Sequence, residues 1–293
     1  VLGAAARRWT RVRSVALVDR QIRLQLAVGT RLVSIDVAGF FDDLPESAAL
    51  EDAEVTITGA AMTGFNPRGQ VVSALMMAPS MEMIRILRVA PRESEIPSRT
   101  FRDLLRFDPQ GASDHRVKVT GTVTHFSPGE AVYLTHAETS LRATTHETVP
   151  LQPGSEVEVL GFPAHGAVGP ILEHSHTRLL REGSAPAAIR VTFKQALSGD
   201  HEAGLVTLDA RLLGQTRKAQ DCDYVFESDG SAFRGSLSLP EGSVAPQLEN
   251  GSLARLTGIL MTEGELERRE GPGFRPTAWH LLLRSPADIA VLQ

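Results

Sequence analysis

Hydrophobic and polar residues alternate along most of this chain with a period of two. The alternation is clearest over 116–126, where apolar residues stand at 117, 119 and 123 between polar neighbours. Successive side chains of a β-strand point to opposite faces of its sheet, so this pattern predicts a strand with one buried face. A Ser-Pro-Gly-Glu turn at 127–130 and an apolar run at 131–135 follow. The two runs predict a β-hairpin.

Three further runs complete a unit in the middle of the chain. Strands are expected at 141–145, 156–162 and 168–180, with a turn at Pro153-Gly154. Five short strands within about 65 residues, with a glycine in the first and in the fourth, are typical of a small, strongly bent barrel of the OB type.

The flanking sequences repeat this arrangement. Strands are predicted at 9–19, 21–28, 30–37, 53–59 and 71–89 before the central unit, and at 205–212, 224–227, 231–237, 248–258 and 278–292 after it. Short amphipathic helices are predicted at 100–107, after Ser98, and from Thr192 to 197, where Thr192 and Gln195 have capping-box spacing. Each helix is expected to plug one end of the barrel that follows it.

One segment recurs three times in the chain. The stretches 50–59, 151–161 and 248–258 each begin with Leu, continue through a turn and alternating apolar positions, and end in Gly. Their glycines lie roughly 100 residues apart, which is the size of a domain and not of a solenoid repeat. The sequence therefore predicts an all-β fold of three tandem OB-like five-stranded Greek-key barrels joined by short helices, at 1–90, 91–182 and 183–293.

Composition narrows the functional classes. The chain has 293 residues, of which 42% are apolar and 22% charged, as in a folded protein of two or three domains. A net charge of −5 and an aromatic content of 5% are unfavourable for phosphate contacts and for base stacking, so no nucleic-acid partner is expected. The chain begins without Met and ends on an apolar strand, which suggests a fragment of a longer protein.

Several motifs resemble a known family. They are Gly-Phe-Asn-Pro-Arg-Gly-Gln at 64–70, the junction at 97–107, the strand at 115–124, Leu-Gln-Pro-Gly at 151–154 with Glu-Val-Glu-Val-Leu-Gly at 156–161, and Leu-Leu-Arg-Ser-Pro-Ala-Asp-Ile at 282–289. These motifs are similar to the extracytoplasmic input region of bacterial membrane-bound sensor histidine kinases, which carries tandem OB-like domains. A similar region occurs on some membrane-bound diguanylate cyclases.

The resemblance implies a function and a setting. The chain would be the periplasmic sensory module of a two-component histidine kinase, binding an unknown small molecule or protein signal. It would relay a change of conformation to a transmembrane helix that follows the last strand. The parent protein would be membrane-anchored, and a homodimer formed through the parent kinase is a further expectation. The alternatives are an extracytoplasmic protein-binding adaptor and, by fold analogy, a nucleic-acid-binding OB array.

Two groups of residues are candidates for binding. Asn66, Arg68 and Gln70 lie on a tight turn and could bind a polar or anionic ligand, although such a turn commonly serves only its own backbone. His174 and His176 are two residues apart on a strand, so both would face one way as a metal pair requires. A third ligand would have to come from elsewhere, and the candidates are His125, His136 and His165.

No catalytic residue is predicted. The chain lacks a Ser-His-Asp spacing, a phosphate loop and a metalloprotease motif, and no cofactor is expected. Cys222 is the only cysteine, which excludes an intrachain disulfide and a zinc site built on cysteines. We interpret it as an ordinary strand residue; as a reactive thiol it would need a lowered pKa. The sequence favours a binding module over an enzyme.

Overall fold

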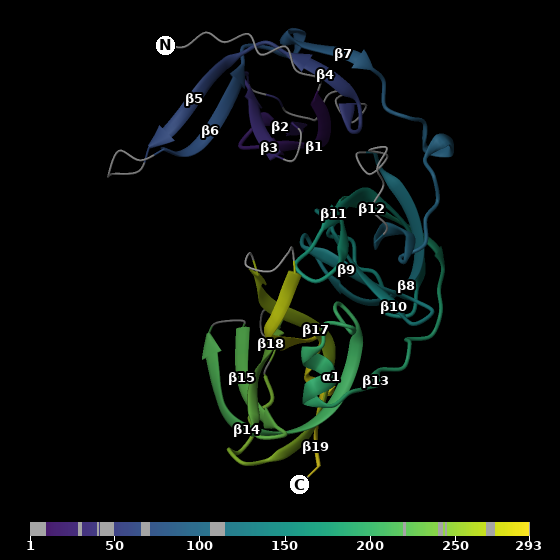
Figure 1. The fold of residues 1–293 in the computed structure, drawn as a ribbon, viewed down its shortest axis with the longest axis vertical. Coiled ribbons are helices and arrows are strands. Elements are labelled where there is room, and N and C mark those ends of the chain that lie inside the picture. Colours follow the sequence, from purple (N-terminus) through teal and green to yellow (C-terminus); the bar gives the residue numbers. More distant parts are fainter. Residues whose placement is uncertain are drawn as a thin grey trace. The chain divides into compact units, whose positions relative to one another are not determined.

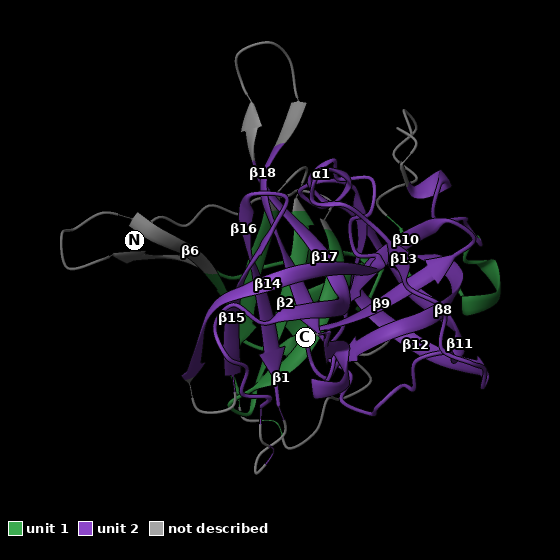
Figure 2. Ribbon diagram, turned by 90° about the horizontal axis from the view of Figure 1, so that it is seen from below, with its two compact units in different colours: residues 1–97, 114–116 green, residues 98–113, 117–293 purple. Residues whose placement is uncertain are grey.

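The structure is a computed structural model. It describes residues 10–28, 31–39, 41, 50–65, 71–105, 115–218, 221–239, 243, 245–267 and 273–292. The chain divides into two compact units, 1–97 with 114–116 and 98–113 with 117–293 (Figure 2). The second unit holds two closed barrels. The domain boundaries at 90 and 182 stay predictions.

The first unit is built on one seven-stranded sheet. Its strands are β1 (Thr10–Val18), β2 (Gln21–Val28), β3 (Arg31–Val37), β4 (Glu54–Ile57), β5 (Ala60–Phe65), β6 (Val71–Ala78) and β7 (Ile84–Arg88), with 3₁₀ turns η2 (Met81–Met83) and η3 (Glu93–Glu95) (Figure 1). The sheet order is β5-β6-β3-β2-β1-β4-β7. Because β4 pairs with β1 and β5 pairs with β6, the two behave as halves of a single fourth strand.

The second unit begins with a closed barrel, called here the β8–β12 barrel. It follows the turn η4 (Asp103–Leu105) and consists of β8 (Val117–Ser127), β9 (Ala131–His136), β10 (Thr139–Thr144), β11 (Glu156–His165) and β12 (Pro170–Arg181). The strand order is β10-β12-β11-β8-β9. Counted within the barrel, strand five lies between strands three and four, which is the Greek-key order of an OB fold.

The β14–β18 barrel completes the second unit. Its elements are β13 (Ile189–Arg190), α1 (Phe193–Leu197), β14 (Leu205–Lys218), β15 (Asp221–Ser228), β16 (Ser231–Ser238), β17 (Leu253–Glu267), β18 (Gly273–Leu283), η6 (Pro286–Asp288) and β19 (Ile289–Val291). Pairing of β14 with β17 closes the sheet β13-β14-β15-β16-β18-β17-β19 on itself. The predicted fold class is confirmed: the protein is all-β and OB-like.

The two predicted helices have different outcomes. Thr192 caps α1, and Gln195 donates its backbone N–H to the Thr192 hydroxyl while its side chain accepts from the Thr192 backbone, so the predicted capping box is present. At 100–107 the described part contains only the 3₁₀ turn η4. Phe101 is nevertheless buried in the core of the β8–β12 barrel and acts as a plug without a full helix. In the described residues no helix has the length and apolar character needed to cross a membrane.

The repeated glycine of the fourth strand has a steric cause. A Cβ at Gly258 would lie 2.8 Å from the carbonyl oxygen of Leu282 on the fifth strand. A Cβ at Gly59 would overlap the carbonyl oxygen of Met77, and one at Gly161 the hydroxyl of Ser175. In all three copies the fourth strand therefore approaches the fifth so closely that only glycine fits.

The first strand of each copy carries a bulge at the same place. The pairing of strands one and two shifts register after Val12, after Val123 and after Leu212. Because a β-bulge increases the local bend and twist of a strand, a bulge here helps the first strand curve around its barrel.

The residue before each bulge also holds the turn that leads into strand four. Val123 accepts a hydrogen bond from the N–H of Gly154 at 2.8 Å and donates its own N–H to Ser155 at 2.8 Å. Leu212 is bonded in the same way to Gly251 and Ser252, and Val12 to Asp52 and Ala53. The turn residue that donates its N–H to the first strand has a left-handed backbone in each copy, with φ of +98° at Gly154, +91° at Gly251 and +68° at Asp52.

Candidate binding site at the junction of two barrels

Strand β9 is buried on both of its faces. Val132 and Leu134 point into the β8–β12 barrel, where they belong to its core. Ala131 and Tyr133 point outward, yet they are 1% and 5% exposed, because they form a second apolar cluster with Ala203, Leu205 and Ile259 of the β14–β18 barrel. The β14–β18 barrel therefore docks on the outer face of β9, the second strand of the β8–β12 barrel.

The docked surface is the face that OB folds commonly use for ligands. In this fold the second and third strands and the loop between strands four and five form the usual binding face. Docking of the β14–β18 barrel covers part of that face and leaves a cavity of about 410 Å³ beside it. Its walls come from β10 and the turn before it, the β11–β12 turn, the connection between α1 and β14, and β17.

Two charged side chains of opposite sign line this cavity. Arg142 is half-buried on β10, and its Nε–H is buried with no hydrogen-bond partner among the described residues. Glu202 accepts the backbone N–H of Thr262 at 2.7 Å. Burial raises the pKa of the Glu202 carboxyl, although the hydrogen bonds from Thr262 and the charge of Arg142 act against the rise. The lining thus contains an Arg142 N–H without an acceptor among the described residues and a Glu202 carboxyl group with a raised pKa.

Glycines allow the two barrels to approach at the edges of the cavity. Gly199, which follows α1, has φ of +85°, and a Cβ there would lie 2.9 Å from Cγ1 of Val168 on the β11–β12 turn. A Cβ at Gly204 would lie 3.3 Å from the hydroxyl oxygen of Ser140. Side chains at these positions would push the walls apart.

A polar contact joins the barrels close to the end of the chain. The backbone N–H of Arg284 donates to Oδ2 of Asp288 at 2.7 Å, and its guanidinium bonds the same carboxylate through Nε at 3.0 Å and Nη2 at 2.7 Å. Nη1 of the same guanidinium donates to the carbonyl oxygen of Thr124 in the other barrel at 3.3 Å. Asp288 precedes β19 directly, so the last strand is attached to both barrels.

His125 lies beside this contact. Its ring stacks on Tyr133 with 5.7 Å between centroids, and its Nε2 is 3.1 Å from the Ser127 hydroxyl. The pKa of His125 is lowered to about 4, first by burial and then by the charge of Arg284, while the charge of Asp288 acts against the shift. The imidazole is therefore neutral at neutral pH, and protonation would place a second positive charge next to Arg284.

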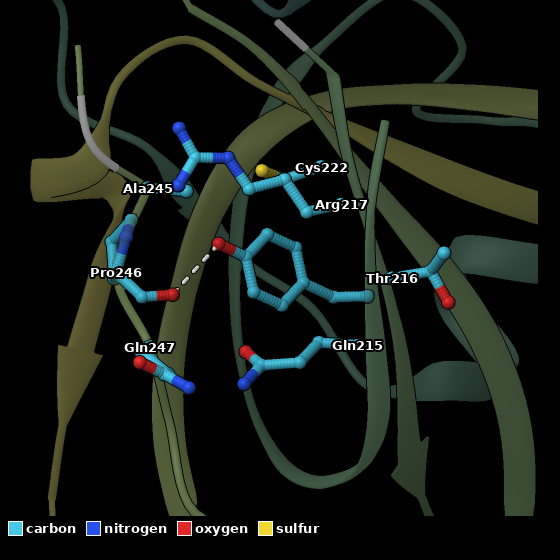
Figure 3. Close-up of a pocket in the computed structure, with 8 residues that line it drawn as sticks. Gln215, Thr216, Arg217, Cys222, Ala245, Pro246 and Gln247 are labelled. Carbon is cyan, nitrogen blue, oxygen red and sulfur yellow. Dashed lines mark hydrogen bonds between the residues drawn. The ribbon is translucent and has the colours of Figure 1, made fainter. Parts of the chain in front are cut away.

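A second cavity of about 350 Å³ lies in the β14–β18 barrel (Figure 3). Tyr224 donates its hydroxyl to the carbonyl oxygen of Pro246 at 3.0 Å. The side-chain amide of Gln215 donates to the carbonyl oxygen of Leu248 at 3.1 Å and accepts from the N–H of Leu248 at 3.3 Å. These bonds hold the loop before β17 against the barrel. Cys222 lines the cavity as a buried, free thiol on β15.

The residues proposed from sequence lie elsewhere. Asn66, Arg68 and Gln70 fall outside the described residues, so their role in ligand binding stays a prediction. His174 has φ of +50° at a register shift in β12, and its ring centroid is 6.2 Å from that of His146. Nδ1 of His176 is 3.5 Å from a carboxylate oxygen of Glu147.

The metal-binding prediction gains no further ligand from the described structure. The bulge at His174 breaks the strict alternation that would point it and His176 the same way. Across the described ranges, no three His, Cys, Asp or Glu side chains converge as a metal site requires. Metal binding at His174 and His176 stays a prediction.

The first unit contains a buried ionic cluster around Asp52. The Asp52 side chain is fully buried; Oδ1 is 3.0 Å from Nδ1 of His115, and Oδ2 accepts the backbone N–H of Arg116 at 3.2 Å. Nε of Arg11 lies 3.7 Å from the same carboxylate. Asp52 occupies the left-handed turn position where the other copies have glycine. These contacts explain why a carboxylate stands there.

Comparison with known proteins identifies no family. A scan against family models matches none, and a search of curated proteins finds no match. Among solved structures, the chain is similar to an aspartyl tRNA synthetase from Entamoeba histolytica, with 12% identity and a TM-score of 0.26 over 36% of this chain. It spans only 21% of that synthetase.

Two further similar structures are smaller. The p204 HINb domain shows 13% identity and a TM-score of 0.27, covering 60% of this chain and 97% of that one. A murine DNA binding protein bound with ds DNA shows 8% identity and a TM-score of 0.26, covering 62% and 98%. Identities and TM-scores this low assign none of these proteins' activities to this chain.

One sequence-based expectation is nevertheless corrected. The net charge and low aromatic content predict no nucleic-acid partner, whereas the similar structures include a murine DNA binding protein bound with ds DNA. The expectation was wrong as an exclusion. Net charge sums over the whole chain and does not report a local basic surface, which is what phosphate contacts require.

Proposed function

We propose that this chain is a sensory binding module, in which a small ligand at the junction cavity changes how the β8–β12 and β14–β18 barrels contact each other. The C-terminal strand β19 carries that change onward. In keeping with the family that the sequence resembles, the setting of the proposal is the extracytoplasmic side of a bacterial membrane-bound sensor histidine kinase or diguanylate cyclase. The role proposed is binding and relay, not catalysis.

The contact of Arg284 carries the proposal. This one side chain is held by Asp288 at the start of β19 and donates to Thr124 of the other barrel. A change in the distance between the barrels must therefore stretch this contact or move the turn η6. Because η6 leads into β19, the final strand responds to the junction and not only to its own barrel.

The cavity supplies the means to bias such a change. It lies between the barrels, with Arg142 on one wall and Glu202 on the other. A ligand that bridges these walls binds one separation of the barrels better than another. It can shift the populations by as much as its affinities for the two arrangements differ.

Disruption of the Arg284 contact tests the relay. Spin labels would be placed at the exposed positions Thr148 and Glu249, one in each barrel, in a Cys222→Ala background. Their distance distribution would be measured by pulsed electron spin resonance, and amide exchange would be followed at 289–292. Arg284→Gln is expected to broaden the distribution and to speed exchange in the last strand, because the contact between the barrels is lost.

Arg255→Gln is the matched control. Arg255 forms a bidentate pair with Asp209, at 2.8 and 3.1 Å, entirely within the β14–β18 barrel. This variant is expected to leave the distance distribution unchanged. An Arg284→Gln protein whose distances and exchange match those of wild type would refute the relay. Binding of an oligonucleotide that weakens as salt is raised would instead favour the nucleic-acid alternative.

A further inference from the structure

The polar groups of the junction cavity require both an acceptor and a donor from a ligand. The buried Nε–H of Arg142 lacks an acceptor among the described residues. A buried donor of this kind costs free energy until an acceptor satisfies it. Glu202, on the facing wall, accepts the backbone N–H of Thr262 with one of its carboxylate oxygens. Ser140 brings a hydroxyl group to the same lining. A hydroxyl group can accept from arginine and donate to a carboxylate at once.

The charges of the lining decide against an ionic ligand. Among the lining residues that the structure describes, Arg142 is the only cationic side chain; Glu138, Asp200 and Glu202 are the acidic ones. An anion would meet Arg142 but be repelled by the carboxylates. A cation would be repelled by the guanidinium of Arg142. A neutral molecule meets neither cost.

The remaining wall is apolar. Phe101, Ile171 and Met261 line the cavity together with the glycines of the β11–β12 turn. A volume of about 410 Å³ lies in the range of cavities that hold small organic ligands. The lining therefore combines an apolar surface for C–H groups with a small number of polar groups that favour hydroxyls.

From this lining we propose that the junction cavity binds a neutral polyhydroxylated molecule, a mono- or disaccharide, with one hydroxyl between Arg142 and Glu202. The inference names a ligand class for the proposed sensory site and so rests on that function. The ring carbons lie against the Phe101 side of the cavity, and Arg142 supplies the hydrogen bond that the free protein leaves unmade.

Binding can be measured with neutral, anionic and cationic sugars. Glucose and maltose serve as neutral probes, glucuronate as the anionic probe and glucosamine as the cationic probe. Titrations followed by amide chemical shifts are expected to show saturable binding of a neutral sugar, with shifts confined to 138–142, 166–171, 199–203 and 261–262. Glucuronate and glucosamine are expected to bind at least tenfold more weakly.

Two variants locate the interaction. Arg142→Met is expected to weaken sugar binding about tenfold or more, because a hydrogen bond to a charged group is lost. Arg178→Met is the control, since Arg178 is exposed on the same barrel and pairs with Glu158 away from the cavity. The wild-type shift map gives an independent answer if Arg142→Met fails to fold.

The outcomes separate the ligand class from the relay. Preferential binding of a charged sugar, shifts around Gln215 and Tyr224, or no binding of any probe would overturn the ligand class. Sugar binding at the cavity that leaves the Thr148–Glu249 distance distribution unchanged would support the ligand class and refute the relay. A change in that distribution only when a neutral sugar is bound would support both.

Discussion

Strands β9 and β15 are the same element in two copies of one barrel, and they differ in what covers their outer faces. Tyr133 on β9 and Val225 on β15 occupy equivalent positions, because each pairs with the first residue after the bulge of strand one. Tyr133 is 5% exposed and Val225 is 43% exposed. The inner faces are alike, since Leu134 and Phe226 are both fully buried. Of these two strands, only β9 has the other barrel of the second unit docked on it.

The difference shows how a repeated fold acquires a special site. Each closed barrel is complete without help from the other, so the outer face of strand two is free to vary. In the β8–β12 barrel that face carries Ala131 and Tyr133 and holds the next barrel. In the β14–β18 barrel the corresponding face carries Asp221 and Asp223 around Val225. Docking on this strand forms the junction, and the cavity and the Arg284–Thr124 contact lie beside it.

The largest effect on the free energy of unfolding is expected when the docked aromatic side chain is removed. Tyr133→Ala is expected to lower the free energy of unfolding of the second unit by about 3 kcal/mol, because it leaves a cavity in the buried cluster at the junction. Val225→Ala, at the equivalent exposed position, is expected to change it by less than about 0.5 kcal/mol. Urea denaturation of both variants measures the contrast. Equal effects at the two positions would show that docking contributes nothing at Tyr133.

A smaller effect on stability is expected from protonation of His125 at low pH. The pKa of His125 is lowered from 6.5 to about 4 in the folded protein, so between these values the unfolded chain binds the proton more readily. Stability should therefore be unaffected above pH 6.5 and fall as the pH drops toward 4, by at most about 3 kcal/mol.

His125→Gln isolates this contribution. The difference in unfolding free energy between wild type and His125→Gln, measured by denaturation from pH 7.5 to 4, removes the titration of all other groups. A Gly in β14 occupies the equivalent position, Gly214, so the β14–β18 barrel has no corresponding imidazole. A difference that stays constant with pH would mean that His125 is not desolvated at the junction.

The smallest expected effect concerns the first strands. A Cβ at Gly121 in β8 would lie 2.8 Å from Cζ of Phe101, whereas one at Gly214 in β14 would meet nothing within 4 Å. Gly121→Ala is expected to destabilise the protein by about 2 kcal/mol through overpacking against the plug. Gly214→Ala is expected to be neutral or to stabilise by up to about 1 kcal/mol. Thermal denaturation of the pair would show whether Phe101 is as firmly seated as the structure indicates.

Much of the fold follows from local sequence patterns. Period-two alternation located the strands, and the repeated Leu-turn-Gly segment indicated that one fold recurs. Both signals are strong because they report which side chains face a core within a single strand. The helix expected at 100–107 is the weaker result, since a plug needs only Phe101 and Leu104 to be apolar and makes no demand for regular helix.

The candidate site was much harder to predict. Arg142, Glu202 and Arg284 are far apart in the chain and carry no shared motif, and their places at the junction depend on how two barrels dock. One signal was present: Ala131-Val-Tyr-Leu134 is apolar at every position, whereas the equivalent stretch of β15 begins with Asp223. A continuous run in a barrel strand indicates burial of both faces and therefore a docked neighbour. A bulge at His174 interrupts the alternation on which the histidine prediction relied, and metal binding there stays a prediction.

The hydrogen bonds that precede strand four have a practical consequence. Val12, Val123 and Leu212 each donate their backbone N–H to the equivalent turn of their own copy. The rates of deuterium uptake at these three equivalent amides can be compared in a single sample. Their rates would report the local opening free energy of each copy without dissecting the chain, and would show which part of the protein loosens first when a molecule binds at the junction.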